Sequence, residues 1–384
     1  MMEFIPYAIP LIEDEEIKEV VDTLHSNWLS KGPKTVEFEK RFKEYVKAEH
    51  AIGLNSCTAG LHIAQLAAGI GQGDEVITTP YTFVASANTI IHTGATPVFV
   101  DVDPVTMNID PKKIEEKITS KTKAIIPVHF AGYPCDMDPI MEIAKKYNLI
   151  VIEDAAHAVY TKYKGRIIGS IADFTCFSFY ATKNLVTGEG GLVTTHNEEW
   201  ADKLRVMSLH GMSKNAWNRY GDKGTWYYEV EYPGFKYNMT DMQAALGLVQ
   251  LGKLEKMQKR REEIARKYNE AFSAVEGFIT PYDNSENTHA WHLYVLRIKP
   301  NHFTFDRAEF IELLREKGVG TSVHFIPVPM HPYYKQLGYK IEEYPNALEA
   351  YNGAVSLPLY PKMTDEQVNR VIEVVLELAN TSKK

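Results

Sequence analysis

The stretch FSFYATKNLVTGEGG, residues Phe177–Gly191, predicts a strand, a short turn that carries Lys183, a glycine-rich segment and the start of a further strand. A lysine on such a turn can be partly desolvated, which lowers its pKa and makes its amine a nucleophile able to form a Schiff base. A lysine in a turn is more often a solvated loop residue. The hypothesis of a reactive Lys183 therefore depends on the residues that accompany it.

Short apolar runs alternate with helical stretches on the N-terminal side of this segment. Strands are expected at residues 50–54, 75–79, 97–102, 124–129 and 150–153, and helices at 12–26, 35–47, 59–70, 83–92 and 138–147. Continuous β-branched runs suit strands that are buried on both faces, so the pattern predicts a largely parallel sheet with flanking helices. Strands at 174–179 and 191–195 are too close for a helix between them, which leaves room for an antiparallel member.

A long helical pattern from residue 240 to about residue 275 divides the chain. Thr240 and Asp241 are favourable residues for its N-terminus. We expect an N-terminal arm and a large domain in residues 1–250, and a connector helix with a smaller C-terminal domain in residues 251–384. In the smaller domain, strands are expected at 291–298 and 321–325, and helices at 306–317 and 365–379.

The length of 384 residues suits two domains that share one active site, and the composition is ordinary for a globular protein. The net charge of -8 argues against general binding of nucleic acid. Three cysteines without CxxC spacing and 13 histidines without an HExxH motif disfavour a disulfide scaffold, a metal site and a metal hydrolase. The sequence shows no signal peptide and no apolar run long enough to span a bilayer, so we expect a cytoplasmic protein without a membrane partner.

The segment VIEDAAHAV, residues 151–159, places Asp154 at the end of an apolar strand. Ligands of α/β sheets bind at the carboxyl ends of strands. A carboxylate there can pair with the protonated pyridine nitrogen of pyridoxal 5'-phosphate (PLP), and His157 could contact the ring or its 3-oxygen. The alternative is that Asp154 caps the next helix and that His157 is a packed polar residue.

The segment NSCTAGLHIA, residues 55–64, predicts a strand end followed by a helix N-terminus. Free N–H groups at such a terminus bind phosphate. The candidate phosphate ligands, of which Ser178 comes from another strand end, are Ser56, Cys57, Thr58, Ala59 and Ser178. Phe83 could stack on an aromatic ring. Helix capping by the small polar residues and a plain core role for Phe83 remain open.

Together these segments resemble those of the DegT–StrS family of PLP-dependent nucleotide-sugar aminotransferases. The resemblance covers nearly the whole chain and includes SNWLSKGPKTVEFEK, NSCTAGLH, GDEVITTPYTFVASAN, AIIPVHFAGYPCDMD, VIEDAAHA, FSFYATKNLVTGEGG, LHGMSKNAWNRY, PGFKYNMTDMQAALGLVQL, HAWHLYVLR and SVHFIPV. It implies an α/β fold of type I among PLP enzymes, the aspartate aminotransferase fold. That fold has a large domain with a mainly parallel seven-stranded sheet and a smaller C-terminal α/β domain.

The resemblance also implies roles for cofactor-binding residues. Lys183 would bind the PLP aldehyde and shuttle a proton, Asp154 would pair with the ring nitrogen, and Phe83 would cover the ring face. The other matching positions, which lie near the phosphate or the ring oxygen, are Cys57, Thr58, Ala59, Ser178 and His157. Asn238 matches a residue that reaches the cofactor phosphate of a neighbouring subunit, which would require a homodimer. Alternatively, Asn238 caps the long helix.

Substrate contacts carry over from the family more loosely. The matching positions in the N-terminal loop are Tyr7, Trp28, Leu29, Ser30, Gly32, Pro33 and Lys34, and those elsewhere are Trp217, Arg219, His324 and Phe325. Lys34 and Arg219 are plausible pyrophosphate partners because of their charge. Pro329 stands where several relatives have a histidine, and His331 lies two residues further on, so we assign no catalysis to that segment.

The resemblance implies a ping-pong reaction in which L-glutamate converts PLP to pyridoxamine 5'-phosphate and leaves as 2-oxoglutarate. A nucleotide-linked keto sugar would then receive the amino group, in polysaccharide or lipopolysaccharide biosynthesis. The segment HGMSKNAWNRY and its surroundings most resemble enzymes that act at C4 of UDP-linked sugars, such as those that make UDP-4-amino-4-deoxy-L-arabinose. Lys183 argues against the related 3-dehydratases, which carry histidine there. Amination at C3 of a dTDP-linked sugar, a GDP-perosamine-type reaction and a non-catalytic regulatory protein remain open.

Overall fold

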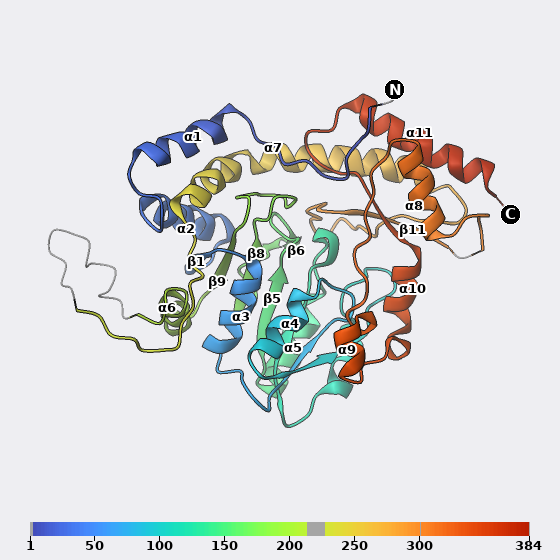
Figure 1. The fold of residues 1–384 in the computed structure, drawn as a ribbon. Coiled ribbons are helices and arrows are strands. Elements are labelled where there is room, and N and C mark those ends of the chain that lie inside the picture. Colours follow the sequence, from blue (N-terminus) through green and yellow to red (C-terminus); the bar gives the residue numbers. More distant parts are fainter. Residues whose placement is uncertain (1–2, 213–226, 300, 384) are drawn as a thin grey trace.

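A seven-stranded sheet forms the centre of the computed structural model, which describes residues 3–212, 227–299 and 301–383 (Figure 1). Its order is β1-β9-β8-β5-β4-β2-β3. The strands are β1 (His50–Leu54), β2 (Glu75–Thr78), β3 (Thr96–Phe99), β4 (Thr122–Ile126), β5 (Ile150–Ala155), β8 (Phe174–Ser178) and β9 (Gly191–Thr195). The other six strands of this sheet all run in one direction, and β9 runs opposite to them. The mainly parallel seven-stranded sheet and its antiparallel member are thus confirmed.

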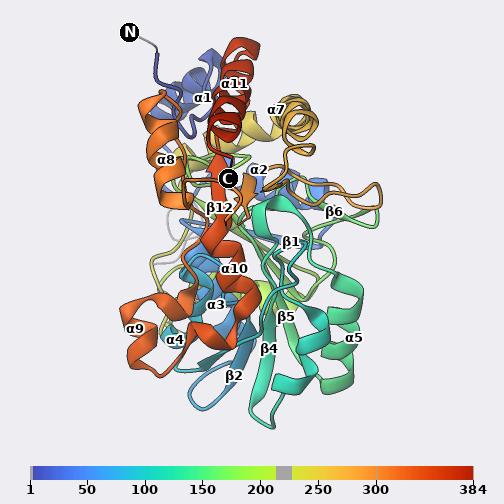
Figure 2. The same ribbon diagram turned by 90° about the vertical axis from the view of Figure 1, so that its right-hand side faces the viewer.

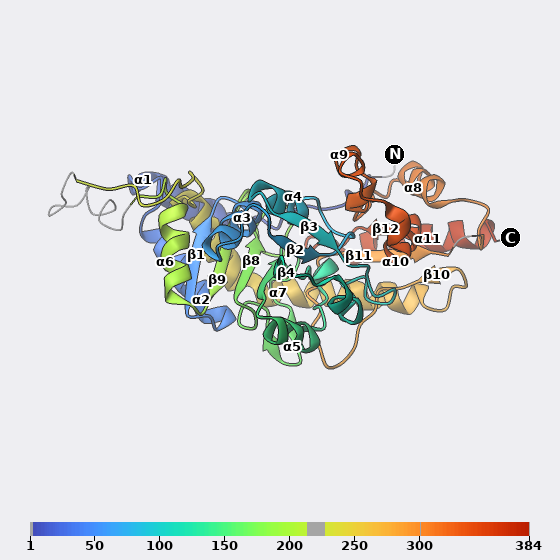
Figure 3. The same cartoon turned by 90° about the horizontal axis from the view of Figure 1, so that it is seen from below.

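Helices cover both faces of this sheet, because its strands carry apolar side chains on both sides. One face packs on α3 (Cys57–Ala67), α4 (Ala85–His92) and α6 (Glu198–Met207). The other face packs on α2 (Pro33–Val46), α5 (Met137–Tyr147) and the first half of α7 (Asp241–Phe272). Figure 3 shows α3 and α5 on opposite sides of the strands. Along β5, Val151 belongs to one of these cores and Ile152 to the other.

A second, antiparallel sheet lies near the C-terminal end of α7 (Figure 1), and Figure 2 shows its strand β12 between α10 and α11. Its strands are β10 (Phe278–Ile279), β11 (Tyr294–Ile298) and β12 (Ala354–Leu357). Helices α8 (Arg307–Glu316), α10 (Pro345–Gly353) and α11 (Asp365–Thr381) lie beside this sheet, whereas Tyr334 of α9 (Pro332–Gln336) binds Asn88 of α4. Tyr268 and Phe272 of α7, Phe310 of α8 and Val371 of α11 share one apolar core with β11. Two further short strands, β6 (Lys162–Tyr163) and β7 (Arg166–Ile167), form a separate hairpin.

Two expectations differ from the structure. Residues 321–325 form no strand, and only Ser322 pairs with Ser356 in an isolated bridge. The segment instead delivers His324 and Phe325 to the pocket described below, and the nearby Pro327 lacks the N–H that a ladder requires. Pro127 likewise follows the end of β4, so that strand is shorter than the 124–129 that we expected.

Helix α1 (Asp14–His25) forms as expected, but its apolar stripe faces away from the rest of the chain. Ile17, Val21 and Leu24 are 55%, 42% and 48% exposed. The buried contact with α7 is polar, since Glu16 accepts hydrogen bonds from the side chains of Gln250 and Lys253. Hydrophobic periodicity predicted the helix correctly, but it does not show which face packs within the chain. Among the described residues, no helix is both long and apolar enough to cross a bilayer.

Candidate active site

A pocket of about 340 Å³ lies at the carboxyl ends of β1, β2, β4, β5 and β8. Segments near residues 292 and 324 close it from the C-terminal part of the chain. Ten of the residues expected from the sequence line it together: Ser56, Cys57, Thr58, Phe83, Asp154, His157, Ser178, Lys183, His324 and Phe325. Strand ends far apart in sequence thus meet at one site, as parallel sheets require.

Lys183 is held on a tight turn whose backbone N–H groups are satisfied locally. Its own N–H donates to the carbonyl of Tyr180 at 2.9 Å, and the N–H of Thr187 donates to that of Phe179 at 2.8 Å. The surrounding protein lowers the pKa of Lys183 to about 8, against a smaller opposing effect of the Asp154 and Cys57 side chains. Since Nζ has no hydrogen bond or ion pair within the described residues, Lys183 presents a partly uncharged amine to the pocket at neutral pH.

Asp154 lies one residue before the end of β5 and is 5% exposed. Its Oδ2 accepts a hydrogen bond from Ser86 Oγ at 2.7 Å, and its Oδ1 accepts one from the Ala156 N–H at 3.1 Å. Burial raises the pKa of Asp154, and the Ser86 bond partly offsets this effect. No helix follows directly, so helix capping does not explain the residue. A cationic group in the pocket would be a favourable partner for this desolvated carboxylate.

Ser86 and His292 belong to this site although sequence reasoning missed both. Ser86 lies in the first turn of α4, three residues after Phe83, and that position was the only available signal. His292 lines the pocket, and its ring lies 4.3 Å from that of His157. It comes from the C-terminal part of the chain, where nothing in the local sequence points toward β5.

His157 and His292 differ in the free ring nitrogen that each presents: Nε2 of His157 is a hydrogen-bond donor and Nε2 of His292 is an acceptor. The Ala131 N–H donates to His157 Nδ1 at 3.2 Å, so the ring proton of His157 is on Nε2. Asn184 donates through Nδ2 to the Ala290 carbonyl at 2.6 Å, which turns its Oδ1 toward His292 Nδ1 at 3.1 Å. His292 Nδ1 therefore carries the proton and Nε2 is an acceptor. Burial holds the pKa of both rings well below the ordinary value, and the charge of Lys183 lowers both further.

The N-terminus of α3 faces the pocket and fits a phosphate group. Ser56 caps the helix, and its Oγ accepts the Ala59 N–H at 3.1 Å. Ala59 is buried, and its N–H is therefore not available to a ligand. The N–H groups of Cys57 and Thr58 precede any partner within the helix and remain for an anion. Ser178 adds a hydroxyl. Together with Lys183 for an aldehyde and Asp154 for a ring nitrogen, these groups match the functional groups of PLP.

Phe83 and Phe325 form the aromatic edge of this pocket, with ring centroids 5.9 Å apart. Phe83 is 58% exposed, so it is no plain core residue. Tyr7 lies behind them, 5.5 Å from the ring of His324, and burial raises its pKa well above the ordinary value. His324 Nδ1 contacts Ser356 Oγ at 2.8 Å, and burial lowers the pKa of His324 to about 4.

The other expected residues do not line the pocket in this single chain. Trp28 and Leu29 are exposed, and Lys34 pairs with Glu19. Ser30 and Gly32 lie in the loop before α2, which begins at Pro33, and Asp241 accepts the Gly32 N–H at 2.7 Å. Asn238 is buried beside Leu54, and its Oδ1 has no partner within the described residues. Trp217 and Arg219 lie outside the described residues.

Comparisons with known proteins agree with this geometry. Residues 10–376 match the model of the DegT/DnrJ/EryC1/StrS aminotransferase family. The chain is 60% identical to the spore coat polysaccharide biosynthesis protein SpsC of Bacillus subtilis, over 98% of this chain and 97% of that protein.

Solved structures give the same result. Spr1654 from Streptococcus pneumoniae, named as a sugar aminotransferase and solved with pyridoxamine phosphate, is 37% identical with a TM-score of 0.93, over 98% of this chain and 99% of that one. It has also been solved in a PLP form. Helicobacter pylori PseC, an aminotransferase involved in the biosynthesis of pseudoaminic acid, is 30% identical with a TM-score of 0.92, over 99% and 100% of the two chains. The chain therefore belongs to the DegT/DnrJ/EryC1/StrS family and is a PLP-dependent sugar aminotransferase.

Proposed function

We propose that the chain transfers the amino group of L-glutamate to C4 of a UDP-linked 4-keto sugar. The observation that carries the proposal is the meeting of a desolvated amine, Lys183, and a buried carboxylate, Asp154, in one pocket of a sugar aminotransferase. The choice of C4 and UDP is supported by the resemblance of the segment around HGMSKNAWNRY to enzymes of that type. The names of SpsC and PseC, which concern a polysaccharide and a sugar acid, are compatible with it.

Lys183 would act twice in this reaction. Its amine would hold the aldehyde of PLP, which supplies an electron sink for the carbon that carries the amino group. Once released, the same amine would take up a proton from one carbon and return it to another. A pKa of about 8 suits both tasks, because general acid–base catalysis is most efficient when the pKa lies near the working pH.

The remaining pocket residues would bind and orient. Asp154 would keep the ring nitrogen protonated, and Ser86 would hold the Asp154 carboxylate in place. The N–H of His157 Nε2 would donate to the ring oxygen, while Cys57, Thr58 and Ser178 would hold the phosphate, with Phe83 covering the ring. Apart from Lys183, no lysine or arginine lines the pocket within the described part of the chain.

We propose that the nucleotide part binds along Trp28 and Leu29 of the loop before α2 and Lys34 of its first turn. Tyr7, His324 and Phe325 would lie nearer the sugar. Lys34 and Arg219 would contact the pyrophosphate. The Lys34 ammonium is paired with Glu19, so an incoming pyrophosphate would have to compete for it. The pyrophosphate carries two negative charges in all, and it can compete because charge-assisted hydrogen bonds to phosphate oxygens are strong.

We further propose a homodimer whose two active sites are shared. Its support is the exposed apolar stripe of α1, the exposed Trp28 and Leu29, and the buried Asn238 Oδ1 that lacks a partner within the described residues. Exposed apolar groups that gather in this way are typical of protein interfaces. Asn238 would complete the phosphate site of the second copy.

The test is a panel of nucleotide-linked keto sugars, given to the purified protein with PLP and ¹⁵N-labelled L-glutamate. The proposal expects label at C4 of a UDP-linked 4-keto sugar, located by NMR of the product. Label at C3 of a dTDP-linked sugar, or transfer to a GDP-linked sugar alone, would replace this substrate assignment. A protein that binds PLP but transfers no label to any sugar would contradict the proposed reaction as a whole.

A further inference from the structure

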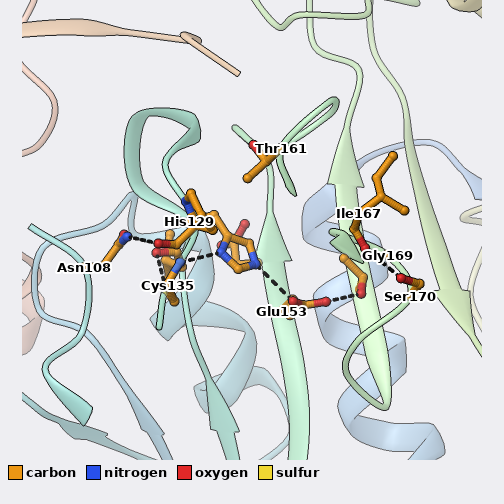
Figure 4. A network of polar contacts seen from close by, with 12 residues as sticks. Asn108, His129, Cys135, Glu153, Thr161, Ile167, Gly169 and Ser170 are labelled. Carbon is orange, nitrogen blue, oxygen red and sulfur yellow. Dashed lines mark hydrogen bonds and ion pairs between the residues drawn. The ribbon is translucent and has the colours of Figure 1, made fainter. Parts of the chain in front are cut away.

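A buried pair of polar side chains, His129 and Glu153, lies next to Asp154, and none of the roles above uses it (Figure 4). Both side chains are fully buried, and His129 Nε2 lies 3.2 Å from Glu153 Oε1. Glu153 also accepts a hydrogen bond from the hydroxyl of Thr175 on β8. Burial of polar groups in a core is unfavourable unless they are satisfied, so such a network needs an explanation.

The hydrogen bonds fix the position of the ring proton on His129. The Cys135 N–H donates to His129 Nδ1 at 3.0 Å, so Nδ1 is an acceptor. The ring proton is therefore on Nε2 and is donated to Glu153 Oε1. The chain of bonds runs from the Cys135 backbone through the imidazole to the Glu153 carboxylate, which the Thr175 hydroxyl binds from the other side.

His129 holds β5 at two points. Its side chain binds Glu153, and its backbone N–H donates to the Asp154 carbonyl at 3.2 Å. The Asp154 N–H donates in turn to the Pro127 carbonyl at 2.9 Å. Because Glu153 and Asp154 point to opposite faces of one strand, a fixed Glu153 side chain also fixes the face to which the Asp154 side chain points, and Ser86 then holds its carboxylate.

The same loop orients a second pocket residue. Two positions after His129, the Ala131 N–H donates to His157 Nδ1 and sets its tautomer. Asn108 accepts the Phe130 N–H at 2.8 Å, and Thr161 donates to the Gly132 carbonyl at 2.8 Å. The loop is thus anchored on several sides, and His129 is the anchor that reaches β5.

We propose that His129 and Glu153 are positioning residues, which act through Asp154 by holding its carboxylate toward the ring-nitrogen side of the pocket. A buried hydrogen-bonded pair that includes a carboxyl group is a poor source of stability, because well-packed apolar residues can often replace even buried ion pairs without loss. A positioning role accounts for a pair in this place, directly behind the carboxylate that must be aimed. The inference depends on the chain being a PLP enzyme and not on which sugar it aminates.

Four substitutions separate three features: the hydrogen bond between His129 and Glu153 (the link), the charge of the Glu153 carboxylate, and the hydrogen bond from the Cys135 N–H to His129. Glu153→Gln removes the charge, but the amide oxygen can still accept from His129. His129→Gln can still donate to Glu153, although it loses the Cys135 bond. Glu153→Ala and His129→Asn both break the link, and the asparagine still accepts the Cys135 N–H. Thr161→Val is the control, because it removes a buried bond to the same loop without touching the bond between His129 and Glu153.

The readouts use the full-length protein with PLP and L-glutamate as the only probes. They are the pH midpoint of the visible absorbance of bound PLP, the rate of conversion by glutamate at saturation, and the glutamate concentration for half-saturation. Weaker pairing of Asp154 should raise the pH midpoint, because a positively charged ring favours proton release elsewhere on the cofactor. Thermal unfolding is recorded for every variant.

For Glu153→Ala and His129→Asn, we expect a rate at saturation that is lower by roughly 10-fold or more, with less change in half-saturation, as misplacement of a reacting group predicts. The pH midpoint should rise by about half a unit or more. Glu153→Gln and His129→Gln should stay within about threefold of the original rate. Thr161→Val should lower the unfolding temperature without moving the pH midpoint.

Three results would overturn the proposal. In the first, the link-breaking variants behave like Thr161→Val, which would make the pair merely structural. In the second, Glu153→Gln lowers the rate at saturation as much as Glu153→Ala does, which would assign the loss of rate to the missing carboxylate charge and not to the link. In the third, His129→Gln has a lower rate at saturation than His129→Asn, which would assign the loss of rate to the missing bond from the Cys135 N–H. If Glu153→Ala does not fold, the two His129 variants alone decide.

Discussion

The depressed pKa of Lys183 makes a quantitative prediction for the protein without cofactor. A shift from 10.5 to about 8 leaves about one Lys183 amine in ten uncharged at pH 7, roughly 300-fold more than for an ordinary lysine. Burial is the main cause, and the neighbouring Asp154 opposes it. Asp154→Asn should therefore lower the pKa of Lys183 further.

The assay is a short pulse of acetic anhydride over a range of pH, followed by mass spectrometry of peptides. Acylation of Lys183 should reach half of its maximum near pH 8, and at lower pH in Asp154→Asn. The exposed Lys112 in the same samples corrects for the reactivity of the reagent. A Lys183 midpoint at the ordinary value of 10.5, or a higher midpoint in Asp154→Asn, would refute the reasoning.

Two further predictions concern the loop at the substrate side and the second copy. Asp241 accepts bonds from Gly32, Lys34 and Thr35 while fully buried, so Asp241→Ala should destabilise the chain by about 3–5 kcal/mol in urea unfolding. The exposed Asp22→Ala serves as its control and should change little. Lys183→Ala and Asn238→Ala should each be nearly inactive, but co-refolded mixtures should regain activity if Asn238 acts across subunits. Failure to regain activity would place Asn238 in its own site.

Much of the sheet could be predicted because its signals are local. The bounds of β1 and β9 agree with the expectation residue for residue, since each is a short apolar run between turn residues. Lys183, Asp154, Cys57 and Ser178 could be grouped because each follows or ends a strand, and parallel strands end at one edge.

Contacts across the fold could not be predicted in this way. His292 reaches the pocket only because the second sheet packs beside it, and Ser86 became recognisable only through its bond to Asp154. The expected strand at 321–325 was wrong because those residues serve the pocket and not a ladder. The apolar stripe of α1 points outward, and hydrophobic periodicity alone does not tell which face of a helix packs within the chain. The division of the chain at residue 250 and the individual site roles stay predictions.

The most direct test of the central claim is the absorbance spectrum of Lys183→Ala with PLP, before and after L-glutamate, beside that of the unchanged protein. The unchanged protein should show the visible band of lysine-bound PLP, which glutamate converts to the spectrum of pyridoxamine phosphate. Lys183→Ala should lack that band and should show no turnover with any keto sugar, because no other amine lines the pocket within the described residues. An unchanged band and an unchanged rate of transamination in Lys183→Ala would contradict the account.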